Sequence, residues 1–443
     1  MLFDQQGNSL TGATPRAVAD FDNAVHAFNI YRGDPVSLLD RAMAEAPAFV
    51  MAHILKAVLF AVATEPAATE GAKGIIAQVK TLPMNERERS LVAALDHILA
   101  GNWTAGATAL DRHSIRYPLD LVALQAGHVS DFFRASARDL RDRIARVLPR
   151  WSADIPGYPV VLGMYSFGLE ESGAYAKAED VGRQAVELQP LDCWAHHAVA
   201  HVMEMQGRAA EGVRWMQDRE PAWSGDDNFL KGHNWWHKAV FHMDLGQGDE
   251  ALALYDGPIR GGRSPVAMDM IDASALLWRL ELDGHDVGDR WVELAAAWDA
   301  HADGKLYPFN DWHAAMAYLG AGRIDDVTRL LAQYRMDGAA PSEAAAWART
   351  TGKDLIEGFA AFHRGDHEAA AGQLYAARHI VNTFGGSHAQ RDIIDWTLTE
   401  AALRGGMSDL AEAMANERLA LKPHSPINRR IFERATNLPI AAE

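Results

Sequence analysis

Several features that define whole classes of protein are scarce in this sequence of 443 residues. Its one cysteine, Cys193, cannot form an internal disulfide, which favours a reducing, cytoplasmic setting. We interpret Cys193 as a small buried apolar residue and not as a nucleophile. No stretch reaches the roughly 18 uncharged apolar residues of a membrane span, and the first residues form no basic, apolar leader. The sequence therefore predicts neither export nor membrane anchoring.

Positive charge is in deficit as well. The 42 Lys and Arg residues stand against 59 Asp and Glu residues, which leaves a net charge of −17. A surface this acidic repels phosphate backbones, so we expect no nucleic acid partner. Hydrophobic residues make up 49% of the chain and charged residues 23%, as in an ordinary globular protein with an ample core.

Strand signals are nearly absent, whereas helical periodicity runs along most of the chain. The clearest unit, residues 168–192, has the pattern helix, turn, helix, stop. Gly173 ends the first helix, Ala178 and Ala185 lie on the apolar stripe of the second, and Pro190 closes it. This order of small, aromatic and proline positions resembles the tetratricopeptide repeat.

Degenerate copies of this unit predict the fold class. Their turns are expected at Gly33, Gly101, Gly207, Gly246, Gly320 and Gly365 and near Gly405. We predict an all-α, right-handed α-solenoid of tetratricopeptide-like helix pairs, a single superhelix over 1–443 with a soft division into 1–150 and 151–443. First helices near 191–206, 232–246, 266–282, 309–320 and 388–404 are expected to line one concave groove.

Histidines gather in one part of the chain. Five of the 19 lie in the 42 residues from His196 to His237, where an even spread gives about 1.8. A phase of 100° per residue, measured from each turn glycine, places seven polar residues in one arc of about 60° to 180°, away from the packing positions. These seven, expected to face the groove, are His197, His201, Glu204, His233, His237, Asn310 and Asp311.

The spacing of these histidines has chemical meaning. His197 and His201, like His233 and His237, are four residues apart on one helical face, and Glu204 follows three residues after His201. Such sets on paired helices bind divalent metals such as zinc, so His197, His201, His233 and His237 are candidate ligands. The same groups could instead act as acid and base, or be half-buried and hydrogen-bonded to neighbours.

Further polar residues occur in otherwise apolar helices. Asp269 and Asp272 could ligate a metal, hold a histidine tautomer or pair with Arg279. Asn310, Asp311 and His313 stand at a predicted helix start, where capping accounts for one of the three. We assign Asp311 and His313 to the catalytic group, and Asn310, Asp269 and Asp272 to substrate binding, together with Asn234.

A Gly-Gly-Ser turn precedes the last predicted groove helix. Free N–H groups at the helix start, with Ser387, His388 and Arg391, suit a carboxylate or phosphate. The same residues also form an ordinary turn and N-cap. We predict an anion-binding role for Ser387, His388 and Arg391.

Five segments together resemble the tetratricopeptide repeat protein 38 family. They are HAVAHVMEMQGR (197–208), KGHNWWHKA (231–239), the helix with Asp269 and Asp272, FNDWHAAMA (309–317) and FGGSHAQRD (384–392). The resemblance covers nearly the whole chain and is least distinct over residues 1–150. It implies a cytoplasmic all-α solenoid and a set of positions, and no particular reaction.

Two functions follow from the sequence. In the first, the groove is the pocket of a hydrolase or lyase that acts on a small anionic metabolite, by amide or ester hydrolysis or a related proton transfer, with or without a metal such as zinc. In the second, the chain is a non-catalytic scaffold that binds a peptide or partner protein. The sequence favours the enzyme, because His and Asp outnumber Lys and Arg at the predicted groove positions. Association into a homo-oligomer is left open.

Overall fold

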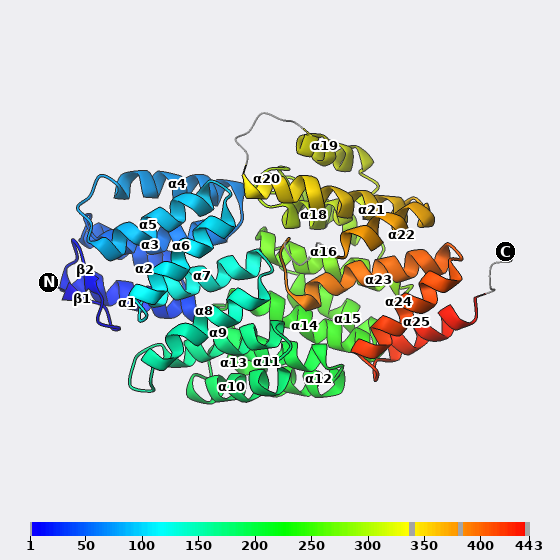
Figure 1. The fold of residues 1–443 in the computed structure, drawn as a ribbon, viewed down its shortest axis with the longest axis horizontal. Helices are drawn as coiled ribbons and strands as arrows, with labels where there is room; N and C mark the ends of the chain where they lie inside the picture. The colour runs from blue at the N-terminus through cyan, green and yellow to red at the C-terminus, as the bar shows by residue number, and fades with distance from the viewer. Residues whose placement is uncertain (1, 336–341, 380–383, 439–443) are drawn as a thin grey trace. The chain divides into compact units, whose positions relative to one another are not determined.

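The computed structural model describes residues 2–335, 342–379 and 384–438, and these are mostly α-helical (Figure 1). Consecutive helices pack against each other in pairs, as α1 does with α2, α5 with α6, and α9 with α10. Two strands of two residues, β1 (Leu2–Phe3) and β2 (Ser9–Leu10), pair in antiparallel register. The predicted all-α array of tetratricopeptide-like helix pairs is thereby confirmed.

The chain forms two compact units, and the division between them falls inside helix α11. The first unit comprises residues 1–199 and 220–231. Its elements after the strands are α1 (Pro15–Asn29), α2 (Pro35–Glu45), α3 (Val50–Val62), α4 (Pro66–Val79), α5 (Glu86–Leu99), α6 (Trp103–Arg116), α7 (Leu121–Phe133), α8 (Ala137–Val147), a 3-10 turn (Leu148–Arg150), α9 (Tyr158–Glu171), α10 (Tyr175–Leu188), the first half of α11 (Cys193–Met205) and α13 (Glu220–Trp223).

The second unit comprises residues 200–219 and 232–443. After the end of α11 it contains α12 (Ala209–Asp218), α14 (Lys231–Asp244) from its second residue, α15 (Gly248–Leu254), a π turn (Tyr255–Ile259), α16 (Ala267–Leu282), α17 (Arg290–Trp298), α18 (Pro308–Gly320), α19 (Ile324–Arg335), α20 (Glu343–Trp347), a π turn (Ala348–Gly352), α21 (Lys353–His363), α22 (His367–Ala377), α23 (His388–Arg404), α24 (Ser408–Leu421) and α25 (Pro426–Thr436). Helices α11, α14, α16, α18 and α23 lie within about two residues of the predicted first helices.

Glycines end the first helices of the pairs because they adopt the left-handed conformation at little cost. Gly173, Gly207 and Gly246 have φ of 77°, 67° and 74°. In the pair α18 and α19 the predicted turn glycine is wrong by two positions, because Gly322 has positive φ (72°) and Gly320 is the last residue of α18. A Cβ at position 320 would fall 2.4 Å from the Trp291 ring, so packing fixes glycine there.

Small residues bring the two helices of a pair close together. In the first unit, Ala178 and Ala185 of α10 are fully buried, as the repeat pattern predicts. Between them, a Cβ on Gly182 would fall 2.6 Å from both Ser166 Oγ and Val199 Cγ2. A larger side chain at any of these three positions would therefore clash with the neighbouring helix.

The core of the second unit is rich in tryptophan. Trp278 of α16 lies 4.9 Å from the Phe359 ring, and Trp312 of α18 meets the same ring edge to face at 5.3 Å. Trp298 Nε1 donates to Ser274 Oγ at 3.0 Å, which satisfies a buried polar group. These contacts pack α16 against α17 and α21, and α18 against α21.

The C-terminal helices of the second unit fold back onto α16. Helices α23, α24 and α25, coloured orange to red in Figure 1, pack consecutively, and α23 packs against α16. Trp278 Nε1 donates to Thr397 Oγ1 of α23 at 3.1 Å, and Arg430 of α25 pairs with Asp283 at 2.8 Å. The face of α16 toward α23 is therefore covered.

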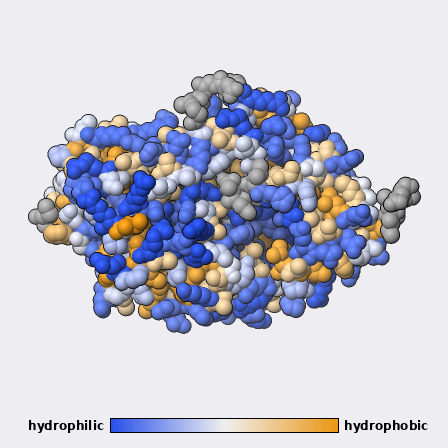
Figure 2. All heavy atoms as spheres, in the orientation of Figure 1, coloured by the Kyte–Doolittle hydropathy of each residue, from blue (hydrophilic) through white to orange (hydrophobic). Residues whose placement is uncertain are grey.

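Among the described residues, no helix has the length and apolar character that a membrane crossing requires. The face drawn in Figure 2 is mainly hydrophilic, with hydrophobic residues in small scattered groups.

Candidate functional site: a buried histidine and carboxylate centre

Three helices of the second unit supply a group of buried polar side chains. His201 and Glu204 come from α11, His233 and His237 from α14, and Asp272 from α16. All five are at most 6% exposed. Since the two histidines of α14 are one turn apart, their rings project from the same face. We call these five residues the histidine centre.

Two imidazoles of the histidine centre are each hydrogen-bonded to a carboxylate. His237 Nδ1 lies 2.9 Å from Glu204 Oε2, and His233 Nδ1 lies 2.9 Å from both carboxylate oxygens of Asp272. The His237 ring centroid is 4.5 Å from that of His201 and 4.8 Å from that of His233. A carboxylate at Nδ1 favours the tautomer with its proton on that nitrogen, so Nε2 carries the lone pair. Of the three alternatives for Asp272, the structure places it where it holds a histidine tautomer.

Two cations border the histidine centre. Lys422, at the end of α24, has its Nζ 3.9 Å from Glu204 Oε1 and 3.9 Å from Asp244 Oδ2. Arg279 lies with its guanidinium carbon 5.2 Å from the Trp236 ring centroid and donates to the Ala389 carbonyl at 2.8 Å.

The surroundings of His237 favour its neutral form. Burial, and then the like charges of His201, His233, Arg279 and Lys422, hold its pKa well below the usual range. His237 is therefore a neutral imidazole near pH 7.

His197 precedes His201 by one turn on α11, within the part of that helix that belongs to the first unit. Its ring packs 4.7 Å from Trp194 and 5.4 Å from Phe167. Within the second unit, His201, His233 and His237 each offer a nitrogen as a potential metal ligand, and these atoms lie within 4.8 Å of one another.

The expectation that these residues line an open groove is wrong. His201 and His237 have no exposed surface, and His233 is 6% exposed. The physical reason lies in the C-terminal helices, because Lys422 reaches Glu204 and the α23 backbone accepts from Arg279. The arc of polar side chains thus faces protein. Helical phase alone does not predict this, because the covering residues Lys422 and Ala389 come 218 and 110 residues after their partners Glu204 and Arg279.

Helix α18 divides the predicted polar trio into different environments. Asp311 Oδ1 accepts from the Gly304 amide at 3.1 Å and Oδ2 from the Tyr334 hydroxyl at 3.0 Å. Burial raises the pKa of Asp311 to about 7. Asp311 therefore ties α18 to α19 and to its own preceding loop.

The other two members of that trio are also buried. His313 Nδ1 donates to the Phe309 carbonyl at 2.8 Å, and burial lowers the pKa of His313 to about 3, with a further contribution from the positive charge of Arg279. Asn310 is 2% exposed.

Asn234 follows His233 directly in the sequence, and Asp269 precedes Asp272 by three residues. Asn234 is fully buried, and neither its amide oxygen nor its nitrogen has a hydrogen-bond partner in the part of the chain that the structure describes. Asp269 is half-buried beside the Ser264 hydroxyl, and burial raises its pKa. Its Oδ1 would lie 2.8 Å from a Cβ at Gly232, which explains the glycine at the start of α14.

The residues predicted to bind an anion build the start of α23. Ser387 Oγ accepts from the Gln390 amide at 3.2 Å, while Gln390 Oε1 accepts from the Ser387 amide at 3.0 Å, which is a capping box. Arg391 Nη1 donates to the Gly386 carbonyl and, at 3.4 Å, to that of Gly385. Ser387 and Arg391 are at most 6% exposed, and His388 is half-buried. Of the two roles considered from the sequence, anion binding and helix capping, the structure shows Ser387 in the second, as the N-cap of α23.

Sequence reasoning missed Lys422 as a neighbour of the histidine centre. A lysine at a helix end followed by proline is common, because such a side chain complements the helix dipole. Nothing in the local pattern distinguishes it from an exposed residue.

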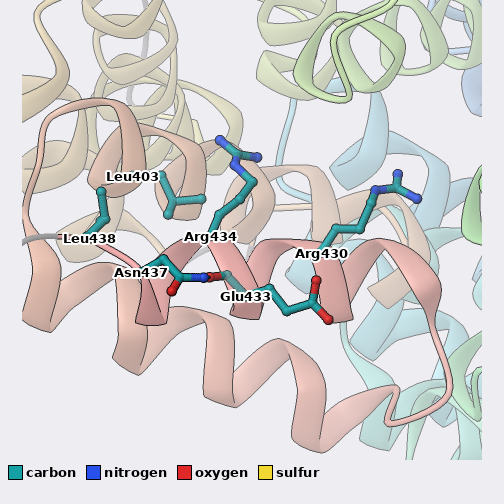
Figure 3. A pocket seen from close by; sticks show the side chains of 6 residues that line it. All are labelled: Leu403, Arg430, Glu433, Arg434, Asn437 and Leu438. Atoms are coloured by element: carbon teal, nitrogen blue, oxygen red, sulfur yellow. The ribbon is translucent and has the colours of Figure 1, made fainter.

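A surface hollow of about 620 Å³ lies beside α25 (Figure 3), and its lining residues are other than the predicted site residues. Arg430 and Arg434 extend from α25, and each is paired with an acid, Asp283 or Glu400. The hollow is lined by Leu403, Arg430, Glu433, Arg434, Asn437 and Leu438.

No protein-family model matches the chain. Among solved structures, the chain is similar to the crystal structure of the APC/C hetero-tetramer Cut9-Hcn1, with 14% identity and a TM-score of 0.46 over 95% of this chain and 76% of that one. It is also similar to the human IFIT1 dimer with PPP-AAAA, with 13% identity and a TM-score of 0.42 over 96% and 95% of the two chains. At these scores the similarities carry no inference about ligands or partners.

Proposed function

We propose that the chain is a helical-repeat scaffold that binds a partner protein with a basic surface. The supporting observation is that the side chains predicted from the sequence to act in catalysis or substrate binding are buried. His237, Asp311 and Arg391 are 0%, 1% and 6% exposed, and each is hydrogen-bonded within the protein. Side chains held in this way are not presented to a metabolite arriving from solvent.

The charge of the chain supports the nature of the partner. A net charge of −17 attracts a basic surface over the range of the Debye length and opposes an acidic one. The exposed faces of the helix pairs supply the contact area, as in other repeat proteins. Membership of the tetratricopeptide repeat protein 38 family belongs to the same proposal and is supported by the five sequence segments.

A peptide array tests the scaffold proposal. The full chain is applied to 15-residue peptides of equal hydropathy whose net charge is graded from −5 to +5. Binding should increase with positive charge and weaken between 50 and 300 mM salt. Equal binding to acidic and basic peptides, or no binding at any charge, would contradict the proposal.

A second candidate, an enzyme acting on a small carboxylated or phosphorylated metabolite, is supported by the two carboxylate and imidazole pairs. A carboxylate at Nδ1 orients an imidazole for proton transfer at Nε2. Access for the metabolite then requires movement of the α24 end that carries Lys422. Turnover of small amides and esters is the assay, with His237→Gln as the test variant and His242→Gln, on the same helix, as the control. Loss of turnover in the first variant alone, at unchanged melting temperature, would favour the enzyme over the scaffold.

A further inference from the structure

The histidine centre brings three imidazoles from two helices within reach of one ion. His201, His233 and His237 belong to the group whose potential ligand atoms lie within 4.8 Å of one another. A zinc ion with nitrogen ligands at 2.0–2.1 Å requires nitrogens about 3.4 Å apart in tetrahedral geometry. Each ring would move inward by less than about 1 Å to reach that spacing, which side-chain rotation can supply.

The carboxylates stand behind the imidazoles, where the outer partners of a metal site stand. Asp272 engages Nδ1 of His233 and Glu204 engages Nδ1 of His237, each at 2.9 Å. This arrangement fixes ring orientation, and it makes Nε2 the coordinating atom of both residues.

Charge and donor type select the class of ion. Four carboxylates, Glu204, Asp244, Asp272 and Asp392, stand against three cations, Arg279, Arg418 and Lys422. The formal charges near the imidazoles therefore sum to about −1 and add only a small attraction for a cation. Binding then depends on the coordination bonds. Nitrogen donors favour zinc and its first-row neighbours over magnesium and calcium, which prefer oxygen ligands.

We propose that His201, His233 and His237 bind one divalent transition-metal ion of the zinc class, with Asp272 and Glu204 as positioning residues. The ion joins α11 and α14 at the point where α16 and the end of α24 cover them. Binding of this ion does not depend on which partner protein or metabolite the chain binds. The ion could stabilise the helices of a scaffold or of an enzyme.

Zinc alone is the probe for the test. The full chain is stripped with a chelator and titrated with Zn²⁺ in competition with a chromophoric chelator. One tight site per chain is expected, with affinity reduced at least 100-fold in His237→Gln. His242→Gln, a histidine change on the same helix outside the centre, should bind zinc as the wild type does. Equal zinc affinity in the wild type and His237→Gln would overturn the proposal.

The positioning role of Asp272 gives a second test that keeps all the ligands. Asp272→Asn preserves size and should weaken zinc binding by 10-fold to 100-fold. The Asp272→Asn variant should therefore need a 10-fold to 100-fold higher zinc concentration to reach the same rise in melting temperature as the wild type. A zinc dose response identical to that of the wild type, in a folded variant, would show that the imidazoles do not coordinate the ion as described. Failure of peptide binding or of turnover does not affect either zinc experiment.

Discussion

Replacing Asp311 with Asn should stabilise the protein at neutral pH, although Asp311 is fully buried and twice hydrogen-bonded. Burial raises the pKa of Asp311 to about 7, so the folded protein holds the neutral acid where an unfolded chain is ionised. Because the folded pKa is the higher one, the stability from this group is complete below about pH 4 and is lost as pH rises through 7. Asn is the uncharged counterpart of that neutral acid.

The geometry allows Asn to keep both contacts. Its amide oxygen can accept from the Gly304 amide, and its nitrogen can donate to the Tyr334 hydroxyl oxygen, at the positions where Asp311 oxygens lie 3.1 and 3.0 Å away. A shift of about three pKa units corresponds to about 4 kcal/mol, at about 1.4 kcal/mol per unit. The advantage of Asp311→Asn in free energy of unfolding should therefore grow by about 1.4 kcal/mol per pH unit between pH 5 and 7.

Guanidinium chloride titrations followed by circular dichroism, repeated from pH 5 to pH 8, measure this difference. Asp325→Asn, an exposed change on α19, is the control and should shift the midpoint equally at every pH. Suppose Asp311→Asn lowered the stability by the same amount at pH 5 and pH 8. Asp311 would then be ionised in the folded protein, and its assignment as a neutral structural link would be refuted.

Three further changes test other parts of the structure. Asp131→Ala should destabilise the first unit by about 3–5 kcal/mol, because it leaves buried Arg143 without the carboxylate 2.7 Å away, and a lower melting temperature would report this. Gly182→Ala should reduce stability by about 1–3 kcal/mol through its clash with Ser166, whereas an unchanged midpoint would show that α9 and α10 can separate freely. Arg391→Ala should lower stability by about 1–3 kcal/mol, since the side chain ties the turn before α23, and its effect on binding of inorganic phosphate should be small. This last expectation differs from the anion-binding role that the sequence predicts for Arg391.

The sequence predicts features that depend on local spacing. The bounds of α16 and α23 follow from helical periodicity and turn residues, and the left-handed Gly173 and Gly207 mark the ends of first helices. The shared environment of His233 and His237 follows from their four-residue spacing in the same way. In each instance the determining residues lie within one or two helical turns.

Features that depend on distant parts of the chain escape such reasoning. Phase alone predicts that His237 faces a groove, whereas the return of α23 and α24 buries it. Asp311 accepts a hydrogen bond from Tyr334 of α19. From the sequence alone, a single carboxylate in a helix could equally bind a hydroxyl group or a metal ion, so this partner was not predictable. Gly320 differs from the other turn glycines because the Trp291 ring packs against it, a contact that no repeat pattern encodes.

The metal content of the histidine centre is tested most directly by diffraction from crystals of the full chain grown with zinc, measured on both sides of the zinc absorption edge. We predict one strong anomalous peak about 2.0–2.1 Å from Nε2 of His233, from Nε2 of His237 and from one ring nitrogen of His201. An ordered centre without such a peak, or zinc bound only at surface carboxylates, would contradict it.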